Sequence, residues 1–244
     1  MGMFDGKVVI VTGGGKATLK DGSAGSIGYG IDIAYLVITG RNVAKLEAAK
    51  ESLEAEYGIK VLAFQADVSA GQDNEAVVQN VIDKTIEEFG RIDAVVNNAQ
   101  ASASGVTIEQ HTMDQFNLAI YSGLYATFLY MQKAYPHLKE TKGSVVNFAS
   151  GAGLFGNYGQ CSYAAAKEGI RGLTRVAANE WGKDGVNVNI VCPLAWTAQL
   201  ENFEAAYPRP SRLTSTCRRR AATATSRPRS AALSFSSVAL TSST

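Results

Sequence analysis

Short runs of β-branched residues alternate with longer amphipathic stretches along most of this chain, and this alternation limits the fold more than any other feature. The runs expected to form strands are Lys7–Thr12, Leu36–Thr39, Val61–Gln65, Ala94–Asn97, Ser144–Phe148 and Asn187–Val191. The stretches expected to form helices are Val43–Glu56, Gln72–Phe89, Met113–Lys139 and Tyr163–Lys183. Such alternation is typical of a parallel sheet with helices on both faces. The sequence therefore predicts a doubly wound α/β fold, which binds its ligands at the carboxyl ends of the strands.

The size and charge of the chain exclude several classes of protein. It has 244 residues, 46% of them hydrophobic, enough for one domain with a core on both faces of a sheet. The formal net charge of +1 gives no overall field that would attract nucleic acid or an anionic membrane. The three cysteines lack the spacing of a metal site, and no apolar run is long enough to span a bilayer. We expect a soluble cytoplasmic protein with no metal, nucleic-acid or membrane partner.

Two regions interrupt the alternation. The stretch Ile27–Tyr35 should hold a crossover helix and a turn, but such a crossover needs about ten residues or more. We interpret this as a short deletion near Tyr35 and Leu36. From about Arg209 the chain is rich in Arg, Ser, Ala and Thr and has no amphipathic period. We therefore expect one domain over residues 1–208 and an atypical tail over residues 209–244.

Two interpretations of this tail remain open. Its composition is typical of a disordered basic segment. The alternative, which we favour, is a shifted reading frame. With suitable codons, the neighbouring frame of residues 221–231 encodes RYGDVEAEIG, and that of residues 238–244 encodes RPDFKY. A shifted frame implies that the last strand of the sheet is missing.

Glycines follow the first expected strand and recur where the next helix should begin. The residues concerned are Gly13, Gly14, Gly15, Ser26 and Ile27. Backbone N–H groups in such a loop can approach a pyrophosphate closely, and the dipole of the following helix adds attraction. A mobile surface loop is the alternative. The position directly after a buried strand favours a dinucleotide site of the Rossmann-like type.

The second expected strand ends at Gly40 and Arg41, without an acidic residue. An acid at this place would bind the ribose hydroxyls of NAD, whereas Arg41, assisted by Lys16, can pair with the 2′-phosphate of NADP. An ordinary solvated arginine is the alternative. The sequence thus favours NADP(H) as the cofactor and leaves NAD(H) open.

Further polar residues lie at the ends of the third and fourth expected strands. Asp67 and Val68 follow one of them, and the turn that contains Asn97 and Ala99 follows the other. Asp67 can accept a hydrogen bond from an adenine amino group, and Asn97 can hold the loop behind a cofactor. Each residue alone is more often a loop cap. Their shared place at one edge of the sheet favours cofactor binding.

Ser150, Tyr163 and Lys167 form the most specific pattern in the chain. Tyr163 and Lys167 are four residues apart and so lie on one face of a helix. A phenol with a pKa of about 10 is a poor base, but a nearby ammonium favours the phenolate. Tyr163 can then exchange a proton with a substrate hydroxyl or carbonyl, while Ser150 hydrogen-bonds the same oxygen. A solvated helix pair is the alternative for the spacing alone, and the surrounding motifs favour a catalytic group.

Together these residues resemble the short-chain dehydrogenase/reductase family, from Lys7 to about Pro208. The resemblance implies that Ser150, Tyr163 and Lys167 are catalytic, and that Lys167 also anchors the nicotinamide ribose. It further implies that Pro193 and Thr197 lie where the nicotinamide carboxamide binds. It implies a homotetramer as well.

The chain also resembles a narrower group, the bacterial bile-acid 12α-hydroxysteroid dehydrogenases. The segments that carry this resemblance are TGGGKATLKDGSAGSIGYG, NNAQASASG, SGLYATF and NFASGAGLFGNYGQCSYAAAKEGIRG. A steroid substrate would suit an apolar wall, for which we expect Leu154, Phe155, Tyr158 and Trp196. Simple core packing is the alternative for each of these side chains.

The chain departs from the family at several places. Gly123 stands where the family has an asparagine that completes a proton relay, so water or another residue must substitute. Gln100 replaces the glycine of the usual Asn-Asn-Ala-Gly, and we expect it to touch the substrate. The terminal strand and the oligomer-forming segment of the family are absent after Pro208.

We therefore expect an NAD(P)-dependent enzyme that interconverts a secondary alcohol and a ketone, with a hydroxysteroid as substrate. Two alternatives are a reductase of short-chain or 3-oxoacyl ketones and a non-catalytic nucleotide-binding protein. A third is a damaged and inactive copy of an enzyme.

Overall fold

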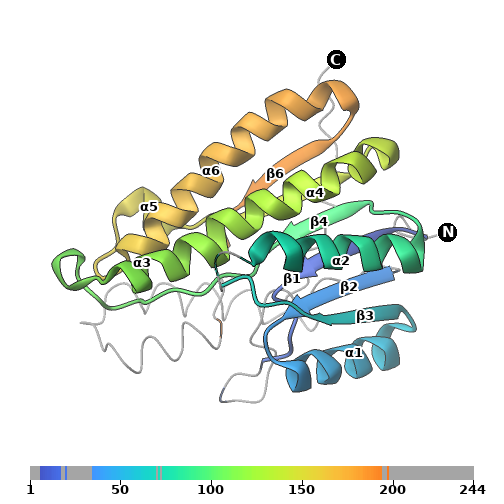
Figure 1. The fold of residues 1–244 in the computed structure, drawn as a ribbon, viewed down its shortest axis with the longest axis horizontal. Coiled ribbons are helices and arrows are strands. Elements are labelled where there is room, and N and C mark those ends of the chain that lie inside the picture. Colours follow the sequence, from blue (N-terminus) through green and yellow to red (C-terminus); the bar gives the residue numbers. More distant parts are fainter. Residues whose placement is uncertain are drawn as a thin grey trace, which may run out of the picture.

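All of the strands expected from the sequence are present in the computed structural model, which describes residues 6–17, 20, 35–69, 71, 73–193 and 197. The elements are β1 (Val8–Thr12), β2 (Tyr35–Gly40), α1 (Val43–Tyr57), β3 (Lys60–Gln65), α2 (Asn74–Phe89), β4 (Ala94–Asn97), η2 (Ile108–Gln110), α3 (Met113–Ala119), η3 (Ile120–Tyr125), α4 (Ala126–Thr141), β5 (Ser144–Phe148), α5 (Gly151–Phe155), α6 (Cys161–Trp181), η4 (Gly182–Asp184) and β6 (Asn187–Val191) (Figure 1). Strands β4, β5 and β6 have the predicted bounds.

The strands form one parallel sheet in the order β3-β2-β1-β4-β5-β6. From β1 the chain winds outward through β2 to β3, and it then returns to β4 and winds outward the other way (Figure 1). This reversal brings the carboxyl ends of β1 and β4 side by side, which is where sheets of this kind bind ligands. The predicted doubly wound, Rossmann-like α/β fold is confirmed.

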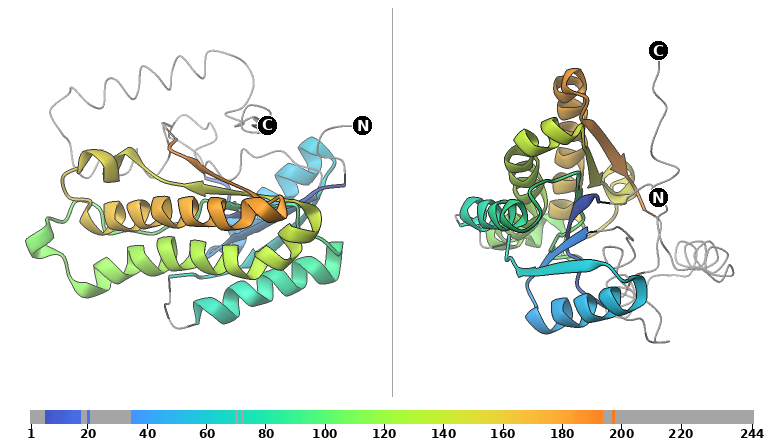
Figure 2. Two further views of the ribbon diagram at one scale, coloured as in Figure 1. Left: turned by 90° about the horizontal axis from the view of Figure 1, so that it is seen from above. Right: turned by 90° about the vertical axis from the view of Figure 1, so that its right-hand side faces the viewer.

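Alternate residues of the central strands pack into two separate core layers. On β1, Val8 and Ile10 join the layer formed with α2, α4 and α6, whereas Val9 and Val11 join the layer formed with α1. Figure 2 shows α1 on one face of the sheet and the other three long helices on the opposite face. Each fully buried aliphatic side chain contributes about 1.5–3 kcal/mol. A slip of one residue would exchange the two faces, so burial on both sides fixes the register.

The single helix expected over Met113–Lys139 is interrupted. Helix α3 begins at a capping box in which Thr112 and Gln115 bond each other's backbone N–H groups. The π-helical segment η3 then joins α3 to α4 without a gap. The amide Nδ2 of Asn74 lies 3.1 Å from the carbonyl oxygen of Tyr121 in this segment and donates to it. The expectation of one regular helix was therefore wrong at its centre.

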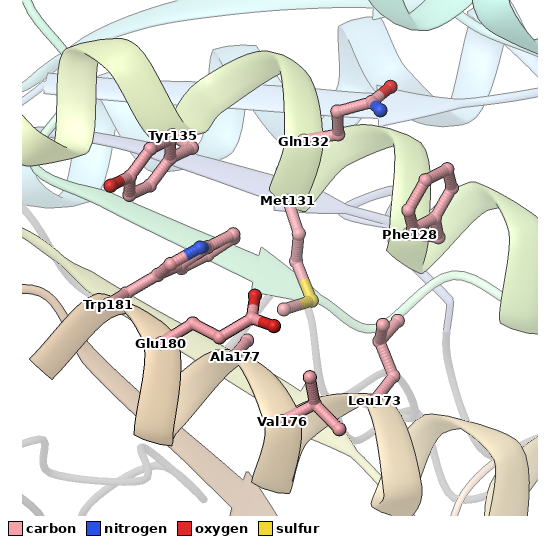
Figure 3. A pocket seen from close by; sticks show the side chains of 9 residues that line it. All are labelled: Phe128, Met131, Gln132, Tyr135, Leu173, Val176, Ala177, Glu180 and Trp181. Carbon is pink, nitrogen blue, oxygen red and sulfur yellow. The ribbon is translucent and has the colours of Figure 1, made fainter.

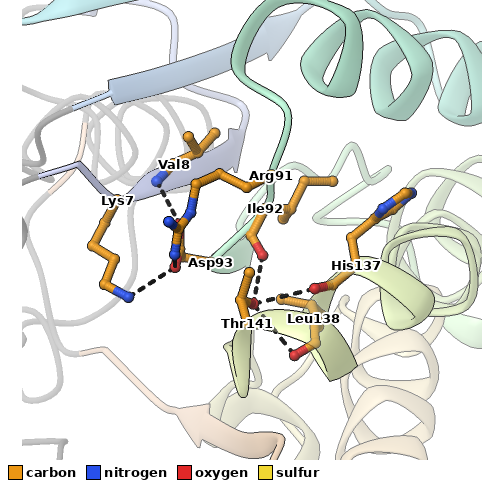
Figure 4. Close-up of polar contacts among 8 residues, drawn as sticks. All are labelled: Lys7, Val8, Arg91, Ile92, Asp93, His137, Leu138 and Thr141. Carbon is orange, nitrogen blue, oxygen red and sulfur yellow. Dashed lines mark hydrogen bonds and ion pairs between the residues drawn. The ribbon is translucent and has the colours of Figure 1, made fainter.

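Asp93 ties together the amino ends of β1 and β4 (Figure 4). Its carboxylate, 8% exposed, accepts hydrogen bonds from the Val8 N–H and the Lys7 ammonium, both at 2.9 Å. Arg91 binds both carboxylate oxygens, at 2.8 and 2.7 Å. Burial alone raises the pKa of Asp93, but these partners outweigh it and hold the pKa below its ordinary value. This cluster is a structural brace at the edge of the sheet away from the expected site.

Several predictions fall outside the described residues. They concern Ser26 and Ile27 at the expected helix start, Trp196 after β6, and the tail over residues 209–244. The structure begins β2 at Tyr35, and the proposed deletion before it and the shifted frame both stay predictions. Within the described ranges no strand follows β6, and no helix is both long and apolar enough to cross a membrane.

Candidate active site

The glycines after β1 are packed closely against the neighbouring strands. Gly13 has a φ of +71°, and a Cβ on it would lie 2.9 Å from Nδ2 of Asn98. A Cβ on Gly14 would lie 2.6 Å from Cγ2 of Ile38. The N–H groups of both glycines donate to the Thr39 carbonyl, at 2.8 and 3.1 Å. The loop therefore needs glycine at both positions to follow this path at the switch point of the sheet.

Thr12 and Asn98 brace the loops that follow β1 and β4. The Thr12 hydroxyl accepts from the N–H groups of Asn98 and Ala99, both at 2.9 Å. The Asn98 amide donates to the carbonyl oxygens of Thr12 at 3.0 Å and Gly13 at 3.3 Å. Sequence reasoning gave Thr12 no role of its own and placed Asn98 in the turn expected on the cofactor side, without predicting this brace. Their only signal was their place at the ends of two strands that the fold makes neighbours.

Asn97 lies deeper than the expected cofactor-side loop. Its side chain is buried, and its Nδ2 donates to Oδ1 of Asn147 on β5 at 2.8 Å. Asn147 in turn donates to the Thr174 hydroxyl of α6 at 2.9 Å. Asn97 therefore links β4 to β5 and, through Asn147, to α6. It supports the strand ends from beneath, and direct contact with a cofactor stays a prediction.

The ends of β2 and β3 bring Arg41 and Asp67 together. The amide of Gln65 donates to the Arg41 carbonyl at 3.1 Å, which holds the two strand ends in place. Asp67 accepts from the Ser69 N–H at 2.9 Å and from the Ser69 hydroxyl at 2.5 Å. Burial raises the pKa of Asp67, but these bonds and the charge of Arg41 outweigh it and lower the pKa. The arrangement places one cation and one anion at the adenosine side of the expected site.

Two other residues expected near the cofactor have partners within the protein. The Val68 carbonyl accepts from Nδ2 of Asn74 at 2.6 Å, which fixes the turn after β3. The ammonium of Lys16 donates to the Ser52 hydroxyl of α1 at 3.1 Å, on the side of α1 that faces this loop.

Ser150, Tyr163 and Lys167 come together at the carboxyl end of β5. Ser150 caps the short helix α5, and its hydroxyl accepts from the Ala152 N–H at 3.1 Å. A side-chain hydrogen bond joins Ser150 to Tyr163 on the first turn of α6. The Lys167 ammonium lies 5.5 Å from the centroid of the Tyr163 ring and donates to the Phe148 carbonyl at 2.8 Å. The three residues that the sequence singled out are therefore spatial neighbours.

The surroundings disfavour the charged forms of both Tyr163 and Lys167. Burial raises the pKa of Tyr163, and the hydrogen bond from Ser150 opposes this rise. Burial also lowers the pKa of Lys167 to about 7. Lys167 thus changes charge near neutral pH, and only its protonated form can stabilise the phenolate. Lys167 can therefore hold or release a proton near neutral pH, where a general acid–base catalyst is most effective.

The residues present fit a bound dinucleotide. A Cβ on Gly15 would meet nothing closer than 3.5 Å, so packing among the described residues does not require glycine there. Close approach of a pyrophosphate to the backbone would require it. Arg41 and Asp67 offer charged partners on the adenosine side, and Tyr163 with Lys167 offers hydrogen-bonding groups on the nicotinamide side. Pro193 follows β6 at the same edge of the sheet.

The side chains expected to form an apolar wall lie at the surface. Leu154 and Phe155 belong to the short helix α5, and Tyr158 follows it. Their exposed fractions are 57%, 82% and 68%, respectively, so core packing does not explain them. They lie next to Ser150 along the chain.

Gln100 and His111 have surroundings that the sequence did not predict. The carboxamide of Gln100 is buried, and a Cβ on Gly123 would lie 2.7 Å from its Cδ. His111 lies 2.9 Å, through Nε2, from the hydroxyl of Ser162, the residue before Tyr163. Both contacts join segments far apart in sequence, so no local pattern signals them.

Comparison with known proteins places this geometry in a family. The family model of the short chain dehydrogenases matches residues 7–206. The chain is 64% identical over 214 residues to a 12alpha-hydroxysteroid dehydrogenase of Clostridium sp., covering 85% of this chain and 80% of that protein.

Solved structures agree with this placement. A crystal structure of levodione reductase has a TM-score of 0.74 and 33% identity, covering 84% of this chain and 78% of that one. A metagenomic short-chain oxidoreductase in complex with NADP has a TM-score of 0.68 and 27% identity, covering 77% and 82%. The chain therefore belongs to the short-chain dehydrogenase family and is a nicotinamide-dependent oxidoreductase.

Proposed function

We propose that this oxidoreductase interconverts a secondary alcohol and a ketone on a steroid, with the 12α-hydroxyl of a bile acid as its substrate. The observation that carries the proposal is the cluster of Ser150, Tyr163 and Lys167 at the end of β5. The 64% identity to a 12alpha-hydroxysteroid dehydrogenase supports the substrate class.

The site residues have distinct roles in this reaction. The nicotinamide, when bound, accepts or supplies the hydride at the carbinol carbon. The Tyr163 hydroxyl takes the substrate proton during oxidation and returns it during reduction. Ser150 donates a hydrogen bond that orients the same substrate oxygen. Protonated Lys167 stabilises the phenolate of Tyr163, and its position on the Phe148 carbonyl fixes that geometry.

An exposed apolar rim supports a steroid as the substrate. Leu154, Phe155 and Tyr158 present large apolar side chains close to Ser150 in the chain. A rigid ring system that covers them removes apolar area from water at about 25 cal/mol per Å². We include Trp196 in the same wall.

NADP(H) is the preferred cofactor in this proposal. Arg41 stands at the end of β2, and the nearby acid Asp67 is already bonded by Ser69. A 2′-phosphate would find a cation here, whereas no carboxylate follows β2 directly to bind the hydroxyls of NAD. Pro193 and Thr197 would hold the carboxamide end, and Gly13–Gly15 with Ser26 and Ile27 the pyrophosphate.

We further propose that the chain forms a homo-oligomer, a tetramer by resemblance, in the cytoplasm. An apolar groove lies between α4 and α6 on the outer face of the molecule (Figure 3). Met131 lies at its base, Tyr135 and Trp181 stack at one end with ring centroids 4.6 Å apart, and Phe128 and Val176 are exposed beside it. A second copy of the chain is the occupant that the proposal assigns to this groove.

A substrate panel tests the proposed function. The full chain is incubated with NADP or NAD and with bile acids that carry hydroxyls at the 3α, 7α or 12α position, and reduced nicotinamide is followed by its absorbance. We expect turnover with the 12α-hydroxyl and NADP. The Tyr163→Phe variant should lose about a hundredfold or more of kcat while it still binds cofactor, because the proton acceptor is removed.

The other outcomes separate the alternatives. Turnover only with short-chain or acyl ketones would replace the steroid by a smaller substrate. Cofactor binding without turnover of any alcohol would identify a nucleotide-binding protein. Retained turnover in Tyr163→Phe would end the proposed mechanism.

A further inference from the structure

Gln100 carries a buried amide that no described residue satisfies. Both Nε2 and Oε1 are inaccessible to solvent and lack a hydrogen-bond partner among the described residues. A buried polar group without a hydrogen bond destabilises the fold, so its presence here needs a reason. Gln100 stands three residues past Asn97, at the carboxyl edge of the sheet where the active site lies.

The amide occupies space that only a glycine at position 123 leaves open. A Cβ on Gly123 would lie 2.7 Å from Cδ, 2.9 Å from Nε2 and 3.0 Å from Oε1 of Gln100. Gly123 belongs to the π-helical segment η3, and π-helical turns occur frequently at functional sites. Gln100 and Gly123 therefore form a matched pair, in which one side chain fills the volume that the other residue lacks.

The loop around Gln100 is held on both sides. The Ala101 N–H donates to the Ser122 hydroxyl at 2.9 Å, and that hydroxyl lies 2.5 Å from the Leu118 carbonyl, to which it donates. On the other side, Ala99 is bonded to Thr12. These contacts press the loop onto η3 directly beside Gly123, so the seat of the Gln100 amide is built into the fold.

Lys167 lies on a helix that packs against the same π-helical segment η3. Asn97 of β4 pairs with Asn147 of β5, and the next residue of β5, Phe148, accepts the hydrogen bond from Lys167 at 2.8 Å. Helix α6 packs on η3 so closely that a Cβ on Gly169 would lie 2.8 Å from Leu124. An ammonium has three donors, and one of those of Lys167 goes to Phe148. The loop that carries Gln100 and the helix that carries Lys167 thus both pack against η3.

We propose that Gln100, seated over the bare Cα of Gly123, is a positioning residue whose amide oxygen accepts a hydrogen bond from Lys167 through one water molecule. The bond holds the ammonium beside Tyr163 and favours its charged form. The other groups that influence the Lys167 charge are Tyr163 on the same helix and Cys192 after β6. The inference rests on the proposed function and gives that site its missing acceptor.

The first test uses the variant Gln100→Met, which keeps the side-chain volume and removes the amide. The control variant is Gln79→Met on α2, where the wild-type amide donates to the surface residue Asp83. We expect Gln100→Met to lose about tenfold or more in kcat with a cofactor KM changed by less than about twofold. The alkaline rise of alcohol oxidation should move to higher pH, because Lys167 is charged less readily. Gln79→Met should match the wild type. A folded Gln100→Met enzyme with wild-type kcat and pH profile would overturn the proposal.

A swap separates positioning from packing. Gly123→Asn alone should be damaged, because its Cβ collides with the Gln100 amide. Gln100→Gly alone should lose kcat. The double variant Gln100→Gly/Gly123→Asn places a new amide in the vacated space, and it should recover most of the kcat that Gln100→Gly loses. A double variant no faster than Gln100→Gly counts against the assignment.

A spectroscopic measurement tests the role of Gln100 without an assay of turnover. If no substrate is turned over, the proposed function fails, but this measurement still shows whether Gln100 influences Lys167. Lysine side chains are labelled with carbon-13, and the Lys167 signal is assigned with Lys167→Arg. The Lys167 titration midpoint should be lower in Gln100→Met than in the wild type, since an acceptor of the charged form is lost. Identical midpoints would overturn the inference.

Discussion

The buried position of Lys167 serves the proposed reaction but lowers the stability of the folded protein. Its side chain is 4% exposed, and burial lowers its pKa to about 7. Between that value and its unfolded pKa of about 10.4, the unfolded chain binds a proton that the folded chain does not. Folding stability therefore rises with pH over this window, and the full cost of burying the charge is present at lower pH.

Replacing this lysine by an apolar residue should stabilise the protein and abolish catalysis. Each pKa unit corresponds to about 1.4 kcal/mol, and the lost bond to Phe148 offsets part of the gain. We expect Lys167→Met to raise the free energy of unfolding by about 1–3 kcal/mol near neutral pH and below. The gain should vanish at strongly alkaline pH. Urea melts at several pH values check this, and a less stable Lys167→Met at about pH 6 would contradict it.

At the scale of elements, sequence patterns located the strands well and the irregular segments poorly. Strands β4, β5 and β6 were predicted with their bounds, because buried β-branched runs between turns are local signals. The π-helical η3 and the short helix α5 were missed. The first depends on Asn74 and on packing against α6, and the second on five residues after Ser150 that include two glycines. The first cause is not visible within a short window of sequence. In the second, the two glycines lower the helix propensity of the segment and so hide the helix.

The candidate site shows the same division. The cluster of Ser150, Tyr163 and Lys167 was predictable because two of its members share a helix face. The brace between Thr12 and Asn98 and the pairing of Gln100 with Gly123 were not predicted. Both depend on β1 and β4 being neighbours, and on η3 lying against the loop after β4. Only the folded chain brings these residues together.

The free energy of unfolding should depend on pH through Asp93, which braces β1 against β4. Its pKa is lowered in the folded chain, so its contribution is present above the unfolded pKa of about 3.9 and is lost as pH falls through the folded value. We expect Asp93→Asn to lower the free energy of unfolding by about 1–3 kcal/mol at neutral pH, because Lys7 and Arg91 lose their partner.

Thermal melts over a pH series measure this effect. The matched control is Glu87→Gln, which breaks an exposed pair with Lys84 and should change stability by less than about 1 kcal/mol. The difference between Asp93→Asn and the wild type should shrink below about pH 3. A difference that is constant with pH would show that the charge of Asp93 contributes nothing.

At the scale of the whole molecule, the helical layer of α4 and α6 leaves apolar side chains exposed on its outer side. Helices α2, α4 and α6 cover one face of the sheet (Figure 2). The outer side of α4 and α6 nevertheless keeps large apolar side chains in solvent. Val176 is 52% exposed there. Large apolar patches on soluble proteins mark interaction sites, which supports the oligomer proposed above.

If a second copy occupies this groove, as proposed, a charge placed there should separate the copies. We expect Val176→Glu to shift the mass measured by light scattering from an oligomer to a smaller species, because burying an unpaired carboxylate is costly. Asn179→Glu, an exposed residue of the same helix outside the groove, should keep the wild-type mass. Circular dichroism checks that both variants stay folded. A Val176→Glu protein with the wild-type mass would place the interface elsewhere.

Because every strand runs the same way, the brace at Asp93 and the loops that carry the chemistry lie at opposite ends of the sheet. A laboratory evolution experiment can therefore randomise Leu154, Phe155 and Tyr158 to change substrate preference without touching the residues that close the far end. Such a library should yield a high proportion of folded members. We therefore expect substrate specificity and folding stability to be separable in this chain.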